Sequence, residues 1–367
     1  MGCAVGALPI DSVEDDRAWL AGAFSAAVES VHPRVALAHL AMPIPEPKGF
    51  GRRRLIAIGK AAGAFARAFV DRYSIDDGIV IAPPDAPALV TGLIDVPGDH
   101  PVPSEASLAA GLRLWDFIGQ VNADDVYIVL LTGGASALCV LPIEGVTLEQ
   151  KRHATMQLMH AGASIAELNQ LRRRLSRIKG GGLERRLAPA RCITLAISDV
   201  QGDDPEVIGS GPTMSSAASL ANYVVIATLD DALRAARAYA AADGIEIMDL
   251  GRTLYGSVES EAVRIVAEIH RCRAARRFGD RPTLLLAGGE PVITVQGDGV
   301  GGRAQHLALA IGAQLDGLEG VTVLAGGTDG IDGPTSAAGA FTDGATAPRL
   351  RARRLNAADV LSRCDSH

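Results

Sequence analysis

The stretch 192–213, CITLAISDVQGDDPEVIGSGPT, decides the fold prediction, because an apolar run gives way there to a polar loop rich in glycine. Cys192 to Ile197 predicts a buried strand, and Asp199 and Asp204 follow it directly. Parallel α/β sheets bind ligands at the carboxyl ends of their strands, so we expect a site here. A plain Asp/Gly turn is the alternative interpretation.

The composition agrees with an α/β enzyme of two domains. The chain has 367 residues, of which 48% are hydrophobic, 21% charged and only 4% aromatic. Such a length exceeds what one hydrophobic core usually supports, and abundant Ala and Gly suit helices packed closely on a parallel sheet. The net charge of −7 argues against a nucleic-acid surface.

We expect a cytoplasmic protein with no membrane partner. The five cysteines are isolated, without a CxxC pair, as is usual for reduced thiols. The start, Met1-Gly2-Cys3, lacks the features of a signal peptide. Residues 126–143 carry no charge, but Gly133-Gly134 and Pro142 interrupt them, which favours strand, turn and helix over a membrane span.

Two further strand ends are candidate anion sites. Leu55 to Ile58 runs into GKAAG (59–63), which places Lys60 at a strand-to-helix turn where a phosphate could bind. The full P-loop motif is missing, so an ordinary exposed lysine remains the alternative. Residues 125–131 run into TGGAS (132–136), whose amides could hold an anion, or whose small side chains could serve packing alone. The absence of GxSxG argues against Ser136 as a hydrolase nucleophile.

Helices are predicted for residues 147–162, 164–178 and 216–242, with a domain boundary near 245. The second carries five cations within residues 172–179, too many for one helix face, so most of them should be solvated. Lys179 is expected to turn inward, because it precedes Gly180-Gly181-Gly182, where backbone can approach a ligand.

Residues 297–303, GDGVGGR, match the dinucleotide motif GxGxxG after a predicted strand, Val292 to Gln296. The acidic ribose contact that should end the next strand is missing, which weakens a nicotinamide site. Alternatively, Arg303 and the helix amides hold an anion together. The loop 326–335 contains Asp329 and repeats the pattern of strand, glycine and spaced aspartates. It suggests a divalent cation but lacks the terminal Glu of an EF-hand.

Five ordered motifs together resemble the glycerate 2-kinase family that carries a MOFRL domain. They are GGASAL (133–138), LSRIKGG (175–181), SDVQGDDPEVIGSGPT (198–213), GGRAQHLALA (301–310) and GGTDGIDGPTSAAGA (326–340). The resemblance covers nearly the whole chain. It implies a Rossmann-like parallel sheet with flanking helices (residues 1–245), a smaller α/β MOFRL-type domain (246–367) and an active cleft between them. It also implies ATP-dependent phosphorylation of D-glycerate to 2-phosphoglycerate with Mg²⁺.

The resemblance assigns roles to individual residues. Lys60, Asp199 and Arg303 are the expected catalytic residues, and Asp199, Asp204 and Asp329 the expected Mg²⁺ ligands. The residues expected to bind ATP or D-glycerate are Gly133, Gly134, Ser136, Lys179, Glu290, Gly301 and Gly302.

The sequence departs from the family pattern in two places. GGRAQH (301–306) stands where related proteins usually show GGRNQE, and the chain stops at His367 where they usually continue, so we expect a truncated C-terminal domain. Two rival functions follow: a nicotinamide-dependent hydroxypyruvate reductase, a label some members carry, or a truncated protein that binds ligand without turnover. A homodimer is left open.

Overall fold

The computed structural model describes residues 13–85, 90–162, 165–274 and 282–367. The chain forms two compact units: residues 32–228, here called the sheet unit, and residues 1–31 with 229–367, here called the split unit. The division after Thr228 differs from the boundary expected near 245, and the first helix belongs with the C-terminal residues. Cys3 and the other residues of 1–12, on which the prediction about the chain start rested, lie outside the described residues.

The sheet unit contains six strands, all parallel, in the order β3-β2-β1-β4-β5-β6. The strands are β1 (Arg53–Ile58), β2 (Asp77–Ala82), β3 (Ile94–Pro97), β4 (Val126–Leu131), β5 (Arg191–Ile197) and β6 (Tyr223–Ala227). This is the strand order of the Rossmann fold, in which ligands bind where the order reverses, between β1 and β4. The predicted parallel α/β sheet is therefore confirmed.

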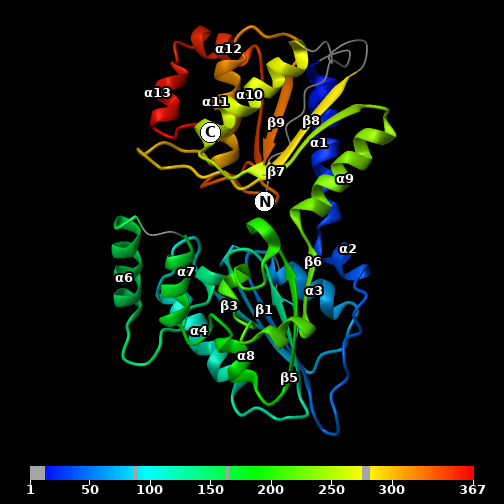
Figure 1. The fold of residues 1–367 in the computed structure, drawn as a ribbon, viewed down its shortest axis with the longest axis vertical. Coiled ribbons are helices and arrows are strands. Elements are labelled where there is room, and N and C mark those ends of the chain that lie inside the picture. The colour runs from blue at the N-terminus through cyan, green and yellow to red at the C-terminus, as the bar shows by residue number, and fades with distance from the viewer. Residues whose placement is uncertain (1–12, 86–89, 163–164, 275–281) are drawn as a thin grey trace. The chain divides into compact units, whose positions relative to one another are not determined.

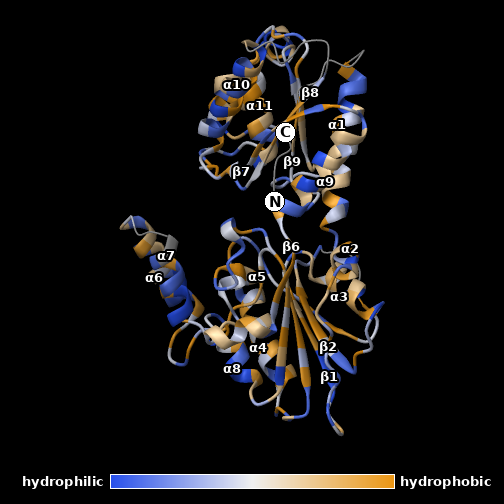
Figure 2. Ribbon diagram, turned by 45° about the vertical axis from the view of Figure 1, so that its right-hand side comes forward, coloured by the Kyte–Doolittle hydropathy of each residue, from blue (hydrophilic) through white to orange (hydrophobic). Residues whose placement is uncertain are grey.

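Helices lie on both faces of this sheet (Figure 2). The helices of this unit are α2 (Pro33–Ala38), α3 (Ala62–Val70), α4 (Glu105–Ile118), α5 (Ala135–Leu138), α6 (Leu148–His160), α7 (Ile165–Arg174) and α8 (Gly182–Leu187), of which α6 and α7 pack against each other to the side of the sheet. Every residue of β1 and β4 is buried, because helices cover both faces. Tyr127 and Val129 pack in one core with Leu114 of α4 and Leu183 of α8.

The split unit joins the N-terminal helix to all elements after residue 228 (Figure 1). Its helices are α1 (Val13–Ser30), α9 (Leu229–Ala242), α10 (Val258–Ala274), α11 (Arg303–Gln314), α12 (Thr346–Ala352) and α13 (Ala357–Ser362). Its strands are β7 (Glu246–Leu254), β8 (Thr283–Gly289), β9 (Thr322–Gly326) and β10 (Gly339–Asp343). β7 and β8 pair in parallel, β9 and β10 pair antiparallel, and α1 packs against α9 and β9.

Two of the predicted elements are wrong. Residues 216–242 are not one helix: a 3₁₀ segment (Ala217–Asn222) precedes β6, because the run of β-branched residues in YVVIA pairs with β5. Residues 292–296 form only an isolated bridge, Val292 to Ser257, and Val292 and Val295 are exposed.

None of the helices in the described ranges is both long and apolar enough to cross a bilayer.

Candidate functional site

Lys60 and the glycines 133–134 meet where the strand order of the sheet reverses. Lys60 follows β1, Gly133 follows β4, and the Lys60 amide donates a hydrogen bond of 2.8 Å to the Gly133 carbonyl. The Ala61 amide donates to Thr132 Oγ1 at 3.1 Å. Gly59 has a φ of 141°, a conformation that favours glycine. These contacts hold the two strand ends against each other.

Asp199, at the end of β5, lies against the same glycines. A Cβ on Gly133 would overlap Asp199 Oδ2, and a Cβ on Gly134 would lie 3.1 Å from Lys60 Cγ and 3.0 Å from His100 Cδ2. The structure thus brings together Lys60, Gly133, Gly134 and Asp199, with His100 beside them. The glycines are needed for space, so the packing interpretation of this loop holds as well.

A second group forms around Lys179, which is 4% exposed, as expected of a cation that turns inward. Its Nζ donates to Ser136 Oγ at 2.6 Å, and Ser136 Oγ lies 3.0 Å from Ser210 Oγ. Burial lowers the pKa of Lys179 well below its ordinary value, and the charges of Lys151 and Arg172 lower it further. Ser210 has a φ of 66°, which is strained for a residue with a Cβ.

The three aspartates expected to bind Mg²⁺ differ in their surroundings. Asp204 is exposed, and its Oδ1 accepts a hydrogen bond of 2.8 Å from the Glu206 amide, so this carboxylate shapes its own turn. Asp329 is exposed in the split unit. Within the described residues, no three His, Cys, Asp or Glu side chains gather as metal ligands. Mg²⁺ commonly takes one or two carboxylates with water and phosphate oxygens, and Asp199 fits that role.

In the split unit, Arg303 pairs with Glu290. Arg303 Nη1 lies 2.8 Å from Glu290 Oε1, and the two side chains are 40% and 41% exposed. Arg303 is the first residue of α11, and Glu290 directly follows β8. Both predicted residues therefore lie together, with the arginine charge partly balanced by the carboxylate.

The helix amides expected to bind an anion beside Arg303 already bind a carboxylate of the protein itself. Asp332, which is 5% exposed, accepts hydrogen bonds from the Ala304 amide at 3.0 Å and the Gln305 amide at 2.7 Å. This carboxylate stands where the pyrophosphate of a dinucleotide would bind. The prediction that Arg303 and these amides hold a ligand together is therefore wrong for the amides, because they donate to Asp332 instead.

The glycines of the GxGxxG motif serve packing within the split unit. A Cβ on Gly302 would overlap Asp332, one on Gly301 would overlap Ser366 Oγ, and one on Gly299 would overlap the Arg363 carbonyl. The motif thus lets the Asp332 loop and the residues 363–367 approach α11 closely. A sequence can therefore match GxGxxG because close packing requires glycine, and the spacing of the glycines does not distinguish this case from a dinucleotide site.

The altered motif GGRAQH is also part of this packing. Gln305 Nε2 donates to Asp332 Oδ2 at 3.1 Å and to Thr335 Oγ1 at 3.0 Å, and Gln305 Oε1 lies 2.8 Å from His367 Nδ1. His306 is 2% exposed, and burial lowers its pKa. The side chains of Gln305 and His306 thus lie inside the split unit.

The sequence prediction missed two residues next to Lys179, namely Lys151 and Arg172. Lys151 lies on α6 and is 5% exposed, and its Nζ finds no hydrogen-bond partner within the described part of the chain. Arg172 of α7 is half-buried. The available signal was the spacing of Lys151 from Leu148, since residues three apart share a helix face.

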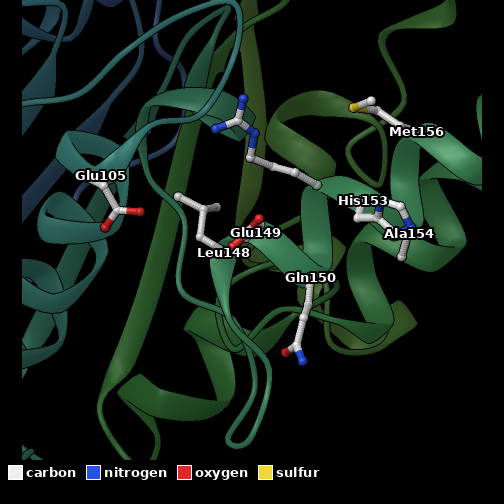
Figure 3. Close-up of a pocket in the computed structure, with 8 residues that line it drawn as sticks. Glu105, Leu148, Glu149, Gln150, His153, Ala154 and Met156 are labelled. Atoms are coloured by element: carbon white, nitrogen blue, oxygen red, sulfur yellow. The ribbon is translucent and has the colours of Figure 1, made fainter.

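A separate groove of about 680 Å³ runs along α6 (Figure 3). Glu105 of α4 lies on one side of it, and Leu148, Glu149 and other α6 residues line the rest. None of the predicted site residues lines this groove. The strand ends therefore remain the candidate site in the sheet unit.

Two family models match the chain: the domain of unknown function DUF4147 over residues 19–240 and the MOFRL family over residues 283–367. The chain is 34% identical to the D-glycerate 2-kinase of Thermotoga maritima, over 85% of this chain and 84% of that protein. It is also 34% identical to an Agrobacterium vitis protein provisionally named hydroxypyruvate reductase, over 86% and 92%. The crystal structure of the Thermotoga maritima glycerate kinase matches with a TM-score of 0.81 at 30% identity, over 96% of this chain and 93% of that one.

Proposed function

The chain belongs to the glycerate kinase family defined by the DUF4147 and MOFRL regions, and on this premise we propose that it transfers the γ-phosphoryl group of ATP to the 2-hydroxyl of D-glycerate. The product would be 2-phosphoglycerate. The observation that carries the proposal is the group of Lys60, Gly133 and Asp199 at the switch point of the six-stranded sheet. This is where Rossmann-type sheets bind nucleotides and related anions.

Phosphoryl transfer depends mainly on positioning and on neutralising the charge of the phosphate oxygens. Lys60 would supply a positive charge beside the amides of the Gly133-Gly134 turn. Asp199 would hold Mg²⁺, which when bound offsets charge on the nucleotide phosphates. Arg303 would supply a further cation, oriented by its ion pair with Glu290.

The direct test is incubation of the purified protein with ATP, Mg²⁺ and D-glycerate, followed by phosphorus NMR of the product. A phosphoryl group on the secondary 2-hydroxyl couples to one proton and gives a doublet, whereas the 3-phosphate couples to two and gives a triplet. We expect the doublet. A triplet would exclude the proposed position of transfer, and no new phosphate ester would exclude the kinase activity.

The roles of the two cations are tested by substitution. Lys60→Ala and Arg303→Ala should each lower kcat/KM by roughly a hundredfold or more, in line with about 3 to 4 kcal/mol for one transition-state charge contact. Lys48→Ala changes an exposed lysine and serves as the control. Full activity in both Lys60→Ala and Arg303→Ala would show that these assignments are wrong.

A nicotinamide-dependent reductase is less well supported. The amides that a dinucleotide would need at α11 donate to Asp332 instead. NADH oxidation by hydroxypyruvate in the absence of ATP would favour that rival. A ligand-induced rise in Tm without any turnover would favour binding alone.

A further inference from the structure

Three cations with reduced access to solvent lie near one another in the sheet unit, and one of them, Lys179, contacts Ser136. Lys151 comes from α6, Arg172 from α7, and Lys179 from the segment after α7. Lys151 and Lys179 are buried and Arg172 is half-buried. Positive side chains from three segments thus converge on one place.

The burial of Lys151 is not explained by packing. α6 has only two buried side chains, Leu148 and Lys151, and its other residues have access to solvent. Removing an ammonium group from water is costly unless an opposite charge or hydrogen bonds compensate for it. If position 151 only packed α6 against the rest of the unit, an apolar residue there would be more favourable than a lysine.

The charges at this place repel one another. Burial lowers the pKa of Lys151 to about 8, with a further contribution from Arg172. Burial lowers the pKa of Lys179 well below its ordinary value, and both Lys151 and Arg172 add to the shift. Among the described residues, none of the three forms an ion pair. The cluster therefore has an excess of positive charge.

Most of the hydrogen-bond donors of these cations are unused. Lys151 Nζ has no partner within the described residues, and Lys179 Nζ donates to Ser136 Oγ. The Arg172 guanidinium makes one long contact, 3.4 Å, to Asn169 Oδ1. An ammonium carries three donors and a guanidinium five, so acceptors are in short supply here. An oxyanion would provide both the missing acceptors and the missing negative charge.

We propose that Lys151, Arg172 and Lys179, with the Ser136 hydroxyl, bind one oxyanion group of a substrate. The chemistry is common to the carboxylate of a sugar acid and the phosphate of a nucleotide. The identity of the substrate that carries this oxyanion group rests on the proposed function. The existence of an oxyanion site does not depend on that function.

The test measures Kd by calorimetry, without Mg²⁺, for D-glycerate, ATP and inorganic phosphate, with glycerol as an uncharged control. We expect Lys151→Met and Arg172→Gln each to raise the Kd of one class of anion about tenfold or more, as loss of a charged hydrogen bond does. A loss confined to D-glycerate identifies a carboxylate site. A loss confined to ATP and phosphate identifies a phosphate site, and glycerol should not bind in this way.

Two controls separate binding from folding. Arg174→Gln removes an exposed cation from the same helix and should leave every Kd unchanged. Lys151→Met should raise the Tm of the ligand-free protein, because it removes a buried unpaired charge, so its weaker binding is not a folding defect. The proposal is overturned if no anion binds the wild type, or if all Kd values in both variants stay within twofold of the wild type. Anion binding without phosphoryl transfer would count against the kinase function alone.

Discussion

Among the glycines of the candidate site, Gly133 has the least space for a side chain. The missing side chain lets the end of β4 lie directly against the Asp199 carboxylate. Overpacking of such a position usually costs about 1 to 3 kcal/mol. Gly133→Ala should therefore lower the free energy of unfolding by this amount and also displace a carboxylate that we assign to Mg²⁺.

The cause can be isolated with a double-mutant cycle. Gly133→Ala is measured by urea unfolding in the wild type and in Asp199→Ala, which removes the overlapping atoms. We expect the cost of Gly133→Ala to fall by at least half in the second background. An equal cost in both backgrounds would show that the Asp199 side chain is not what excludes a methyl group.

Lys151 makes stability depend on pH in a defined window. Its folded pKa of about 8 lies below the ordinary 10.5, so the native state binds fewer protons than the unfolded chain between these values. The free energy of unfolding therefore rises with pH from about 8 to 10.5. Below that window a cost of about 3 kcal/mol is fully present.

Lys151→Met should remove this cost. At pH 7 the variant should be more stable than the wild type by up to about 3 kcal/mol, and the difference should shrink toward zero near pH 10.5. Urea unfolding at both pH values measures it, with Lys48→Met as the exposed control. A difference that does not depend on pH would contradict a lowered pKa of Lys151 in the native protein.

At this scale the sequence predicts strand-end residues better than helix residues. The structure places Lys60 and Asp199 beside Gly133-Gly134, and the sequence indicated both because each follows a recognisable buried strand. Arg172 was assigned to a solvated helix surface and Lys151 was not noticed, because both lie on polar helices. Which cation on such a helix turns inward depends on what packs against it, and propensity does not contain that information.

At the scale of elements, the first amides of α11 obtain their hydrogen-bond acceptor from a residue distant in the sequence. Asp332 accepts from two buried amides of its first turn. Asp332→Ala leaves both donors without a partner and should cost about 2 to 3 kcal/mol. Asn356→Ala removes the exposed cap of α13 and should cost about 1 kcal/mol.

Hydrogen exchange by NMR can localise the Asp332 effect. We expect faster exchange at the Ala304 and Gln305 amides in Asp332→Ala, and no change there in Asn356→Ala. If the amides of Ala304 and Gln305 stay protected in Asp332→Ala, another acceptor must hold the start of the helix.

The prediction of secondary structure from the sequence failed for strands that form because they pair with a neighbouring strand. β6 lies between a 3₁₀ segment and α9, so its five residues were absorbed into one long helical pattern. β10, Gly339–Asp343, has little β-propensity and exists because it pairs with β9. The buried strands β1, β4 and β5 needed no such context, since both faces are apolar.

At the scale of the whole molecule, the assignment of α1 was beyond sequence reasoning. Arg17 pairs with Asp343 at 2.9 Å, Thr322 Oγ1 donates to Asp16 at 2.9 Å, and Trp19 Nε1 donates to Asp243 at 2.7 Å. These contacts join residues more than 200 positions apart, and no local pattern marks them. Periodicity predicts that α1 is a helix, but not where it docks.

The two units should respond separately to core substitutions. Leu20 of α1 is 2% exposed, so Leu20→Ala should cost about 2 to 5 kcal/mol and loosen the split unit. Leu114→Ala, in the core of the sheet unit, is the matched control. Hydrogen exchange with mass spectrometry should show lost protection within residues 229–367 for Leu20→Ala and within 32–228 for Leu114→Ala. Lost protection mainly in 32–228 for Leu20→Ala would contradict the division into units.

The interruption of the split unit by the sheet unit sets the order of events during synthesis. The ribosome makes α1 before the sheet unit, yet α9 and β9, against which α1 packs, follow only after residue 228. Until then α1 lacks these partners, whereas residues 32–228 can fold as soon as they have left the exit tunnel. The sheet unit can therefore fold before the split unit has received all the elements that pack against α1.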